Sequence, residues 1–256
     1  MNAAKHRQAW VPRQHGAWAM LIAPVLTGGI VAGFGWPQAA LVVAWLAAYL
    51  AFMAIRGWLG HNRQWYTVPA LVYAGLSAAC VVCLLVWRPA LAWWALPLAL
   101  LLGASLLLIR AGRERTVLND ALLIGASCLM IVVAVTSGRL SSSVGLGDFL
   151  DGVALGKAWL MAAIFAGYFW GTIFYVKTMI RERGKWGWYV ASVAYHLALV
   201  APAFLVNPWL GGMSVVILLR AALVPRAWPR AKPKQIGLGE VAVTVALVVT
   251  VCLTIL

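Results

Sequence analysis

Acidic residues are scarce in this sequence: only 6 of its 256 residues are Asp or Glu, against 20 Lys and Arg. Charged residues of both signs make up 10% of the chain, whereas soluble domains carry about 25%. Cysteine is limited to four residues, and 64% of the chain is hydrophobic. These proportions exclude a soluble globular protein, a disordered chain and a disulfide-stabilised scaffold. A polytopic membrane protein is the class that remains.

Apolar segments recur along the chain, and each is long enough to cross a bilayer as a helix, which takes about 20 residues. We expect nine spans, at about 17–35, 38–57, 68–87, 90–109, 119–137, 158–177, 188–206, 208–224 and 238–256. Trp and Pro residues gather near the proposed ends, as aromatic belts at the headgroup level would require. The predicted fold is therefore an all-α membrane bundle of about nine helices, forming a single domain over residues 1–256.

The basic residues alternate between the two ends of the predicted spans. The N-terminal tail and the connections after spans two, four, six and eight contain 17 of the 20 Lys and Arg; the other side has Arg88, Arg139 and Lys157. The positive-inside rule places the first side, with the N-terminus, in the cytoplasm. We therefore expect a multi-pass membrane protein whose N-terminus and basic connections lie in the cytoplasm. Orientation and contact with anionic lipid account for the charge, so we expect no nucleic-acid partner.

Two connections carry their own predictions. The long outer connection, 138–157, is rich in Ser and Gly and is expected to contain a short interfacial helix at 147–152. The connection 225–237 contains several Pro residues and cannot be helical throughout.

Small residues in two spans predict close helix packing. Gly29 and Gly33 form a G-x-x-x-G in the first span, a pattern that lets helix backbones approach one another in lipid. Gly211 and Gly212 predict the same in the eighth span.

Polar side chains concentrate at four places on the predicted cytoplasmic side: 13–18, 56–66, 109–120 and 174–189. If these segments converge, they form a cationic cavity suited to phosphate, which the Arg fork binds through two hydrogen bonds. The candidate ligand-binding residues are His15, Arg56, His61, Arg63, Arg113, Arg115, Asp120, Tyr175, Lys177, Arg181 and Glu182. The alternative is a solvated, positively charged rim that sets the topology and binds no ligand.

Several residues have a structural alternative beside the functional one. In a helix through 174–183, Lys177 and Arg181 would share one face, four residues apart. Asp120 is more simply explained by N-capping of the fifth span, by Asn119 or by Asp120 itself. His196, within the seventh span, could relay protons or bind a ligand, but a hydrogen bond inside the bundle is the favoured interpretation.

Two stretches resemble a known family. RQHGAWAMLIAPVLTGG, at residues 13–29, and FYVKTMIRERG, at 174–184, are similar to the YwiC-like family of bacterial membrane proteins. The resemblance implies a bacterial membrane protein and by itself implies no particular activity.

The architecture also has a distant resemblance to the UbiA superfamily of intramembrane prenyltransferases, which have nine spans and polar cytoplasmic connections. In that superfamily, two Asp-rich motifs bind the magnesium–diphosphate of a prenyl donor. The stretches 56–64 and 175–184 stand where these motifs would, and 112–126 resembles a basic stretch before the fifth span. The first stretch has no carboxylate and the second has only Glu182. Because Mg²⁺ requires oxygen ligands, we expect metal-dependent prenyl transfer to be lost, with no metal and no cofactor.

Direct cationic binding of phosphate is what these substituted stretches could still do. The leading hypothesis is a bacterial inner-membrane protein without prenyltransferase activity that binds an isoprenoid or other phosphorylated lipid at a cationic cytoplasmic cavity. One alternative is a divergent UbiA-like prenyltransferase that uses Glu114, Asp120 and Glu182. Another is a small-solute or ion transporter with His196 and Glu240 in its path. A structural or assembly subunit is the fourth, and the sequence indicates no particular protein partner.

Overall fold

The computed structural model describes residues 9–11, 15–59, 63–138, 145–153 and 156–255, and over these residues it is helical without strands. Every predicted span coincides with a helical segment whose ends differ from the prediction by no more than five residues. The helices are α2 (His15–Val31), α3 (Trp36–Leu59), α4 (Arg63–Trp87), η1 (Pro89–Trp94) leading into α5 (Ala95–Arg110), α6 (Val117–Ser137), α8 (Gly156–Met179), α9 (Trp186–Val206), α10 (Pro208–Ala227) and α11 (Pro233–Ile255). The predicted all-α fold is confirmed.

Length and hydropathy identify eight of these segments as membrane-spanning candidates, and α2, with 17 residues, is a shorter apolar helix. The short helix expected in the outer connection is present as α7 (Leu146–Val153). The connection near residue 230 is not helical throughout, as predicted: α10 continues through Pro225 to Ala227, and α11 begins at Pro233.

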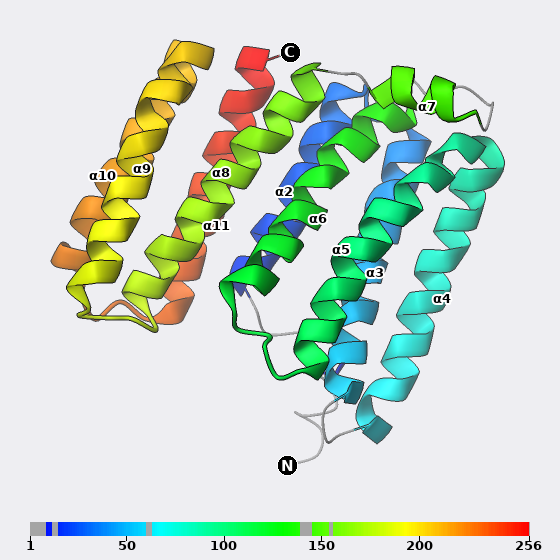
Figure 1. The fold of residues 1–256 in the computed structure, drawn as a ribbon, viewed down its shortest axis with the longest axis horizontal. Coiled ribbons are helices and arrows are strands. Elements are labelled where there is room, and N and C mark those ends of the chain that lie inside the picture. The colour runs from blue at the N-terminus through cyan, green and yellow to red at the C-terminus, as the bar shows by residue number, and fades with distance from the viewer. Residues whose placement is uncertain (1–8, 12–14, 60–62, 139–144, 154–155, 256) are drawn as a thin grey trace. The chain divides into compact units, whose positions relative to one another are not determined.

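The chain divides into two compact units. The first comprises residues 1–14 and 24–159, and within it α3 packs along α4 and α5 packs along α6 (Figure 1). The second comprises residues 15–23 and 160–256, and within it α10 packs against both α9 and α11 (Figure 1). The single membrane domain expected from the sequence stays a prediction.

Close helix packing in the first unit depends on a different glycine from the pair predicted. A Cβ added to Gly28 would lie 2.5 Å from the Ile131 carbonyl oxygen on α6, so only glycine fits there. Gly33 has no neighbour for a Cβ and instead has φ +76° just after α2 ends, which is the left-handed conformation of a helix-terminating glycine. In the second unit Gly211 packs against the ring of Phe204, as expected for this span.

Candidate functional site

The candidates of the first unit gather around Glu114, in the connection between α5 and α6. Arg56, in the last turn of α3, contacts Oε2 of Glu114 through Nη2 at 2.7 Å and through Nε at 3.0 Å. Nε of Arg115 lies 3.6 Å from Oε1 of the same carboxylate. Two of the predicted cationic residues are therefore held by an acidic residue that the prediction assigned only to the transferase alternative.

The remaining candidates of this unit are less closely grouped. Arg113 is exposed, and Asp120 is half-buried in the first turn of α6. The N-cap of α6 is Thr116, whose side chain accepts a hydrogen bond from the Asn119 amide at 3.3 Å, so capping by Asn119 or Asp120 was wrong. His61 and the side chains of His15 and Arg63 lie outside what the structure describes.

The candidates of the second unit lie where α8 ends. Tyr175 is buried in a small core with Met179 on α8, Ala221 on α10 and Ile236 on α11. Nζ of Lys177 lies 5.4 Å from the Trp188 ring centroid.

The helix expected to continue through residue 183 is shorter than predicted: α8 ends at Met179. The chain leaves the helix before Arg181, which is exposed, so Arg181 and Lys177 do not share a helical face. Glu182 forms an ion pair with Lys185, with 2.7 Å between Oε2 and Nζ. The candidates divide between the two units, so their convergence in one cavity stays a prediction.

The transferase alternative relied on Glu114, Asp120 and Glu182, and two of these carboxylates are engaged in the ion pairs above. Among the residues that the structure describes, no group of three or more His, Cys, Asp or Glu is placed to hold a metal ion.

A buried ion pair joins α10 to α11, and the sequence analysis missed it. Nη1 of Arg220 lies 2.6 Å from Oε1 of Glu240, and the two side chains are only 12% and 5% exposed. Arg220 precedes the end of α10 by seven residues and Glu240 follows the start of α11 by seven. At 1.5 Å per residue, each lies about 10 Å inside its helix. Ionisable groups at such a depth in membrane helices commonly mark functional sites.

Hydroxyl groups complete the surroundings of Glu240. Thr172 and Tyr168, both on α8, donate to its Oε2 at 3.1 and 3.5 Å. The Tyr168 hydroxyl also lies 2.9 Å from Oγ1 of Thr244, one turn after Glu240 on α11. We call these four residues, together with Arg220, the Arg220–Glu240 cluster.

The guanidinium of Arg220 has hydrogen-bond donors beyond the one that contacts Glu240. Its central carbon lies 4.3 Å from the ring centroid of Tyr175, a cation–π contact. Its Nε and Nη2 atoms are buried and have no hydrogen-bond partner among the described residues. Two unsatisfied buried donors on one side chain are unusual in a folded protein.

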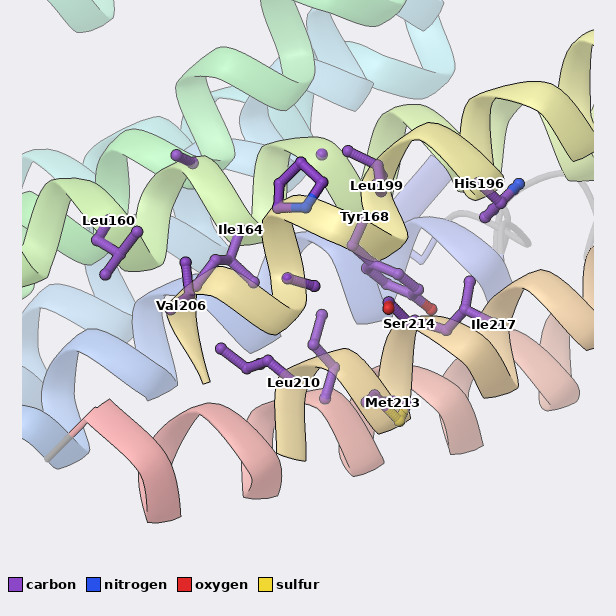
Figure 2. A pocket seen from close by; sticks show the side chains of 15 residues that line it. Leu160, Ile164, Tyr168, His196, Leu199, Val206, Leu210, Met213, Ser214 and Ile217 are labelled. Carbon is purple, nitrogen blue, oxygen red and sulfur yellow. The ribbon is translucent and has the colours of Figure 1, made fainter. Parts of the chain in front are cut away.

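An apolar pocket of about 240 Å³ lies beside this cluster, between α8, α9, α10 and α11. Figure 2 shows side chains from these helices around it, among them Leu160, Leu210 and Tyr168. Tyr168 lines the pocket and also belongs to the cluster. The pocket therefore has an apolar body and polar atoms at one boundary.

His196 also borders this pocket. Its Nδ1 lies 2.7 Å from the Ser192 carbonyl oxygen, one turn earlier on α9, so the favoured interpretation of a hydrogen bond inside the bundle is confirmed. Its ring packs against α8 at Gly171, where an added Cβ would lie 2.6 Å from Nε2.

A second cavity, of about 230 Å³, lies where α8 leads into α9 and α10 approaches its end. We call it the cationic cavity; its charged and aromatic lining consists of Arg183, Lys185, Trp186, Tyr189 and Arg226. None of these five was among the predicted site residues.

Two arginines of the cationic cavity are held in place. Arg183 donates to the Met179 carbonyl at the end of α8, through Nε at 2.8 Å and Nη2 at 2.6 Å, and to the Ala231 carbonyl at 3.0 Å. Arg226 lies over the Tyr189 ring at 4.6 Å. The sequence indicated this region through the many Lys, Arg and Trp residues of 174–189. Because α8 ends at Met179, the residues that line the cavity are not the ones predicted from a longer helix.

Comparison with known proteins identifies relatives over nearly the whole chain. A family model described as "YwiC-like protein" matches residues 11–135. The chain is 31% identical to "Uncharacterized protein YwiC" of Bacillus subtilis, over 97% of this chain and 99% of that protein. It is 25% identical to a protein of Haemophilus influenzae named "Uncharacterized protein", over 91% and 93% of the two chains. No solved structure matches the chain, and the resemblance to the UbiA superfamily stays a prediction.

Proposed function

The chain belongs to the YwiC-like family, and we propose that it binds a phosphorylated lipid at the cationic cavity of its second unit. It is an integral, multi-pass membrane protein by the length and hydropathy of its helices. The proposed location is the bacterial cytoplasmic membrane, with the basic connections on the cytoplasmic side. An isoprenoid phosphate is one member of the ligand class, and an anionic phospholipid is another.

The observation that carries this proposal is the composition of the cationic cavity. Arg183, Lys185 and Arg226 line it, and within the described part of the chain the acidic partner of these three residues is Glu182, bound to Lys185. The remaining positive charge favours a phosphate group, and arginine matches phosphate oxygens with paired N–H donors.

The position of the cavity fits a lipid rather than a free ion. It lies at the ends of three apolar helices, where headgroups meet the membrane–water interface. Trp186 and Tyr189 line it, and amphipathic aromatic rings of this kind belong at that level.

Lipid retention by single-site variants tests the proposal. We expect native mass spectrometry of the purified protein to show retained polyprenyl phosphate or phosphatidylglycerol when either is supplied. Arg226→Ala is expected to reduce retention several-fold, because it removes a cation from the cavity and leaves the backbone contacts of Arg183 in place. Arg181→Ala is the matched control, since Arg181 belongs to the same basic connection, is exposed and does not line the cavity.

Three outcomes of this experiment would contradict or change the proposal. Equal retention by wild type and Arg226→Ala would overturn the cavity as the site. Loss in Arg181→Ala as well as in Arg226→Ala would indicate a diffuse basic surface. Inorganic phosphate as a competitor distinguishes the two sources of phosphate: displacement of lipid at low concentration would indicate a site for the free ion.

A second candidate function is transport of a small solute or ion, and the Arg220–Glu240 cluster favours it. An ionisable pair inside membrane helices is characteristic of substrate and ion pathways. Uptake into proteoliposomes that depends on a membrane potential or a pH gradient, and that is lost in Glu240→Gln, would support transport; equal uptake by both proteins would contradict it.

A further inference from the structure

One edge of the Arg220 guanidinium is free inside the membrane helices. Nη1 faces Glu240, while Nε and Nη2 are buried and have no hydrogen-bond partner among the described residues. These two nitrogens form the edge of the planar group that presents two parallel N–H donors, the arrangement that matches a carboxylate or another oxyanion. Leaving them unsatisfied costs free energy, so this edge is suited to a ligand oxygen pair.

The apolar pocket provides room for the rest of such a ligand. Tyr168 lines the pocket, and its hydroxyl contacts both Glu240 and Thr244. On α10 the pocket-lining Ile217 stands three residues before Arg220, which places the two side chains on one face of the helix. A compact apolar body in the pocket would therefore direct its polar end toward the cluster.

Charge balance decides what else must happen when an anion binds. Arg220 and Glu240 together are neutral, so a bound carboxylate would leave one uncompensated negative charge in a region of low dielectric constant, which is costly. Uptake of one proton by Glu240 restores neutrality. A hydroxyl can accept as well as donate a hydrogen bond, so Thr172 and Tyr168 can stay bonded to the protonated carboxyl group.

Among the titratable groups around the pair, Glu240 contacts the Arg220 guanidinium directly through a carboxylate oxygen, which makes it the proton acceptor of this proposal. Arg220 faces it from α10, and a guanidinium group has no acceptor atom for a further proton. Tyr168 and Tyr175 approach the pair from α8, and tyrosine ordinarily titrates near pH 10. On α9, His196 has its Nδ1 bonded to the Ser192 carbonyl oxygen, while its Nε2 is buried against Gly171 and has no hydrogen-bond partner among the described residues.

We propose that Arg220 and Glu240 form a proton-linked binding site for a small monocarboxylate with an apolar body. The carboxylate takes the free Nε–Nη2 edge of Arg220, Glu240 takes up one proton from solution, and the apolar body occupies the pocket between α8, α9, α10 and α11. No covalent bond other than that O–H bond forms. This site is independent of the phosphorylated-lipid proposal, because it shares none of the charged residues of the cationic cavity.

Calorimetric titration of the wild-type protein in nanodiscs tests the proton linkage, with hexanoate as the probe. Titrations in two buffers of different ionisation enthalpy give the number of protons taken up, and we expect about one for each hexanoate bound. For one linked proton, affinity should rise about tenfold for each unit by which the pH falls between 8 and 6. An uptake of zero protons, or no binding at either pH, would overturn the proposal.

Two variants distinguish this mechanism from simple partitioning of the neutral acid, which would have the same pH dependence. Glu240→Gln imitates the protonated side chain, so it should bind hexanoate with an affinity that no longer changes with pH. If the neutral acid merely dissolves in the pocket, Glu240→Gln will keep the wild-type pH dependence, and the proposal fails. Arg220→Gln should abolish binding of hexanoate while leaving the weak binding of 1-hexanol unchanged.

Glu114→Gln is the matched control, because Glu114 is also paired with an arginine but lies in the first unit. It should bind hexanoate with the affinity and the pH dependence of the wild type. Arg226→Ala should also leave hexanoate binding unchanged, so failure of this proposal and failure of the lipid proposal can be told apart.

Discussion

The two shortest arginine–glutamate pairs in the described part of the chain join the same chemical groups in different surroundings. The Arg56–Glu114 pair has its closest atoms 2.7 Å apart, and its side chains are 32% and 29% exposed. The Arg220–Glu240 pair has them 2.6 Å apart, with side chains 12% and 5% exposed. Distance therefore does not distinguish the pairs; access to water does.

That difference determines what each pair can do. A water-accessible ion pair contributes about 0–1 kcal/mol, because water and salt compensate either partner when the other is removed. A buried pair has no such compensation, so each charge depends on the other. The first pair is suited to holding the connection before α6 against the end of α3. The second can change state only when a proton or another ion takes part.

Removing the carboxylate of the buried pair should have the largest effect on stability. We expect Glu240→Ala to lower the free energy of unfolding by about 3–5 kcal/mol, because it leaves the Arg220 charge buried and unpaired. Glu114→Ala, its counterpart in the half-buried Arg56–Glu114 pair, should cost less than about 1 kcal/mol. Thermal unfolding in detergent, followed by intrinsic tryptophan fluorescence, compares the two midpoints.

A double variant checks that this loss comes from the orphaned charge. Arg220→Met combined with Glu240→Met removes both charges and should recover much of the loss, since apolar residues of similar volume often replace buried ion pairs at little cost. If the double variant unfolds no later than Glu240→Ala, the cluster stabilises the helices through its hydroxyl contacts instead.

The buried amide of Asn119, beside the Arg56–Glu114 pair, should give an intermediate effect. Asn119 is buried, accepts from the Ser105 hydroxyl at 2.6 Å and donates to the Glu114 backbone carbonyl at 2.9 Å. Asn119→Ala leaves these partners unsatisfied, which costs about 1–3 kcal/mol. The same unfolding measurement applies, and a midpoint equal to that of Glu114→Ala would show that the ion pair, and not the amide, holds this connection.

The spans could be predicted from the sequence because a run of apolar residues is a local property. The ends of the helices near residues 87, 137 and 206 needed only hydropathy and the Pro, Gly and Trp residues beside them. The orientation rule that placed 17 basic residues on one side counted Arg220 among the connection residues, although it is flanked by Ile-Leu-Leu and Ala-Ala-Leu-Val. Those apolar neighbours were the signal that Arg220 belongs inside the helix.

The candidate site was less predictable, because it depends on contacts between segments. Nothing local indicates that Glu240 meets Arg220 from the next helix, or that Thr172 and Tyr168 approach it from α8. The grouping of Lys177 with Arg181 failed for a related reason. The Arg183 side chain donates to the Met179 carbonyl, and this contact satisfies the end of α8 where the sequence continues with apparently helical residues.

The smallest effect is expected for the cation of the Arg56–Glu114 pair. Arg56→Gln removes the charge and leaves a shorter side chain with one amide donor group, but Glu114 retains Arg115 nearby, so the loss should be below about 1 kcal/mol. Because salt screens exposed charges, the difference between wild type and Arg56→Gln should shrink further as NaCl rises from 50 mM to about 0.5 M.

Arg220→Gln is the matched control: its effect should persist at high salt, since ions have little access to a side chain that is only 12% exposed. Unfolding midpoints at the two salt concentrations measure both variants. Equal salt sensitivity of the two variants would mean that water reaches the Arg220–Glu240 pair as readily as the Arg56–Glu114 pair. The two pairs would then not differ in their access to water.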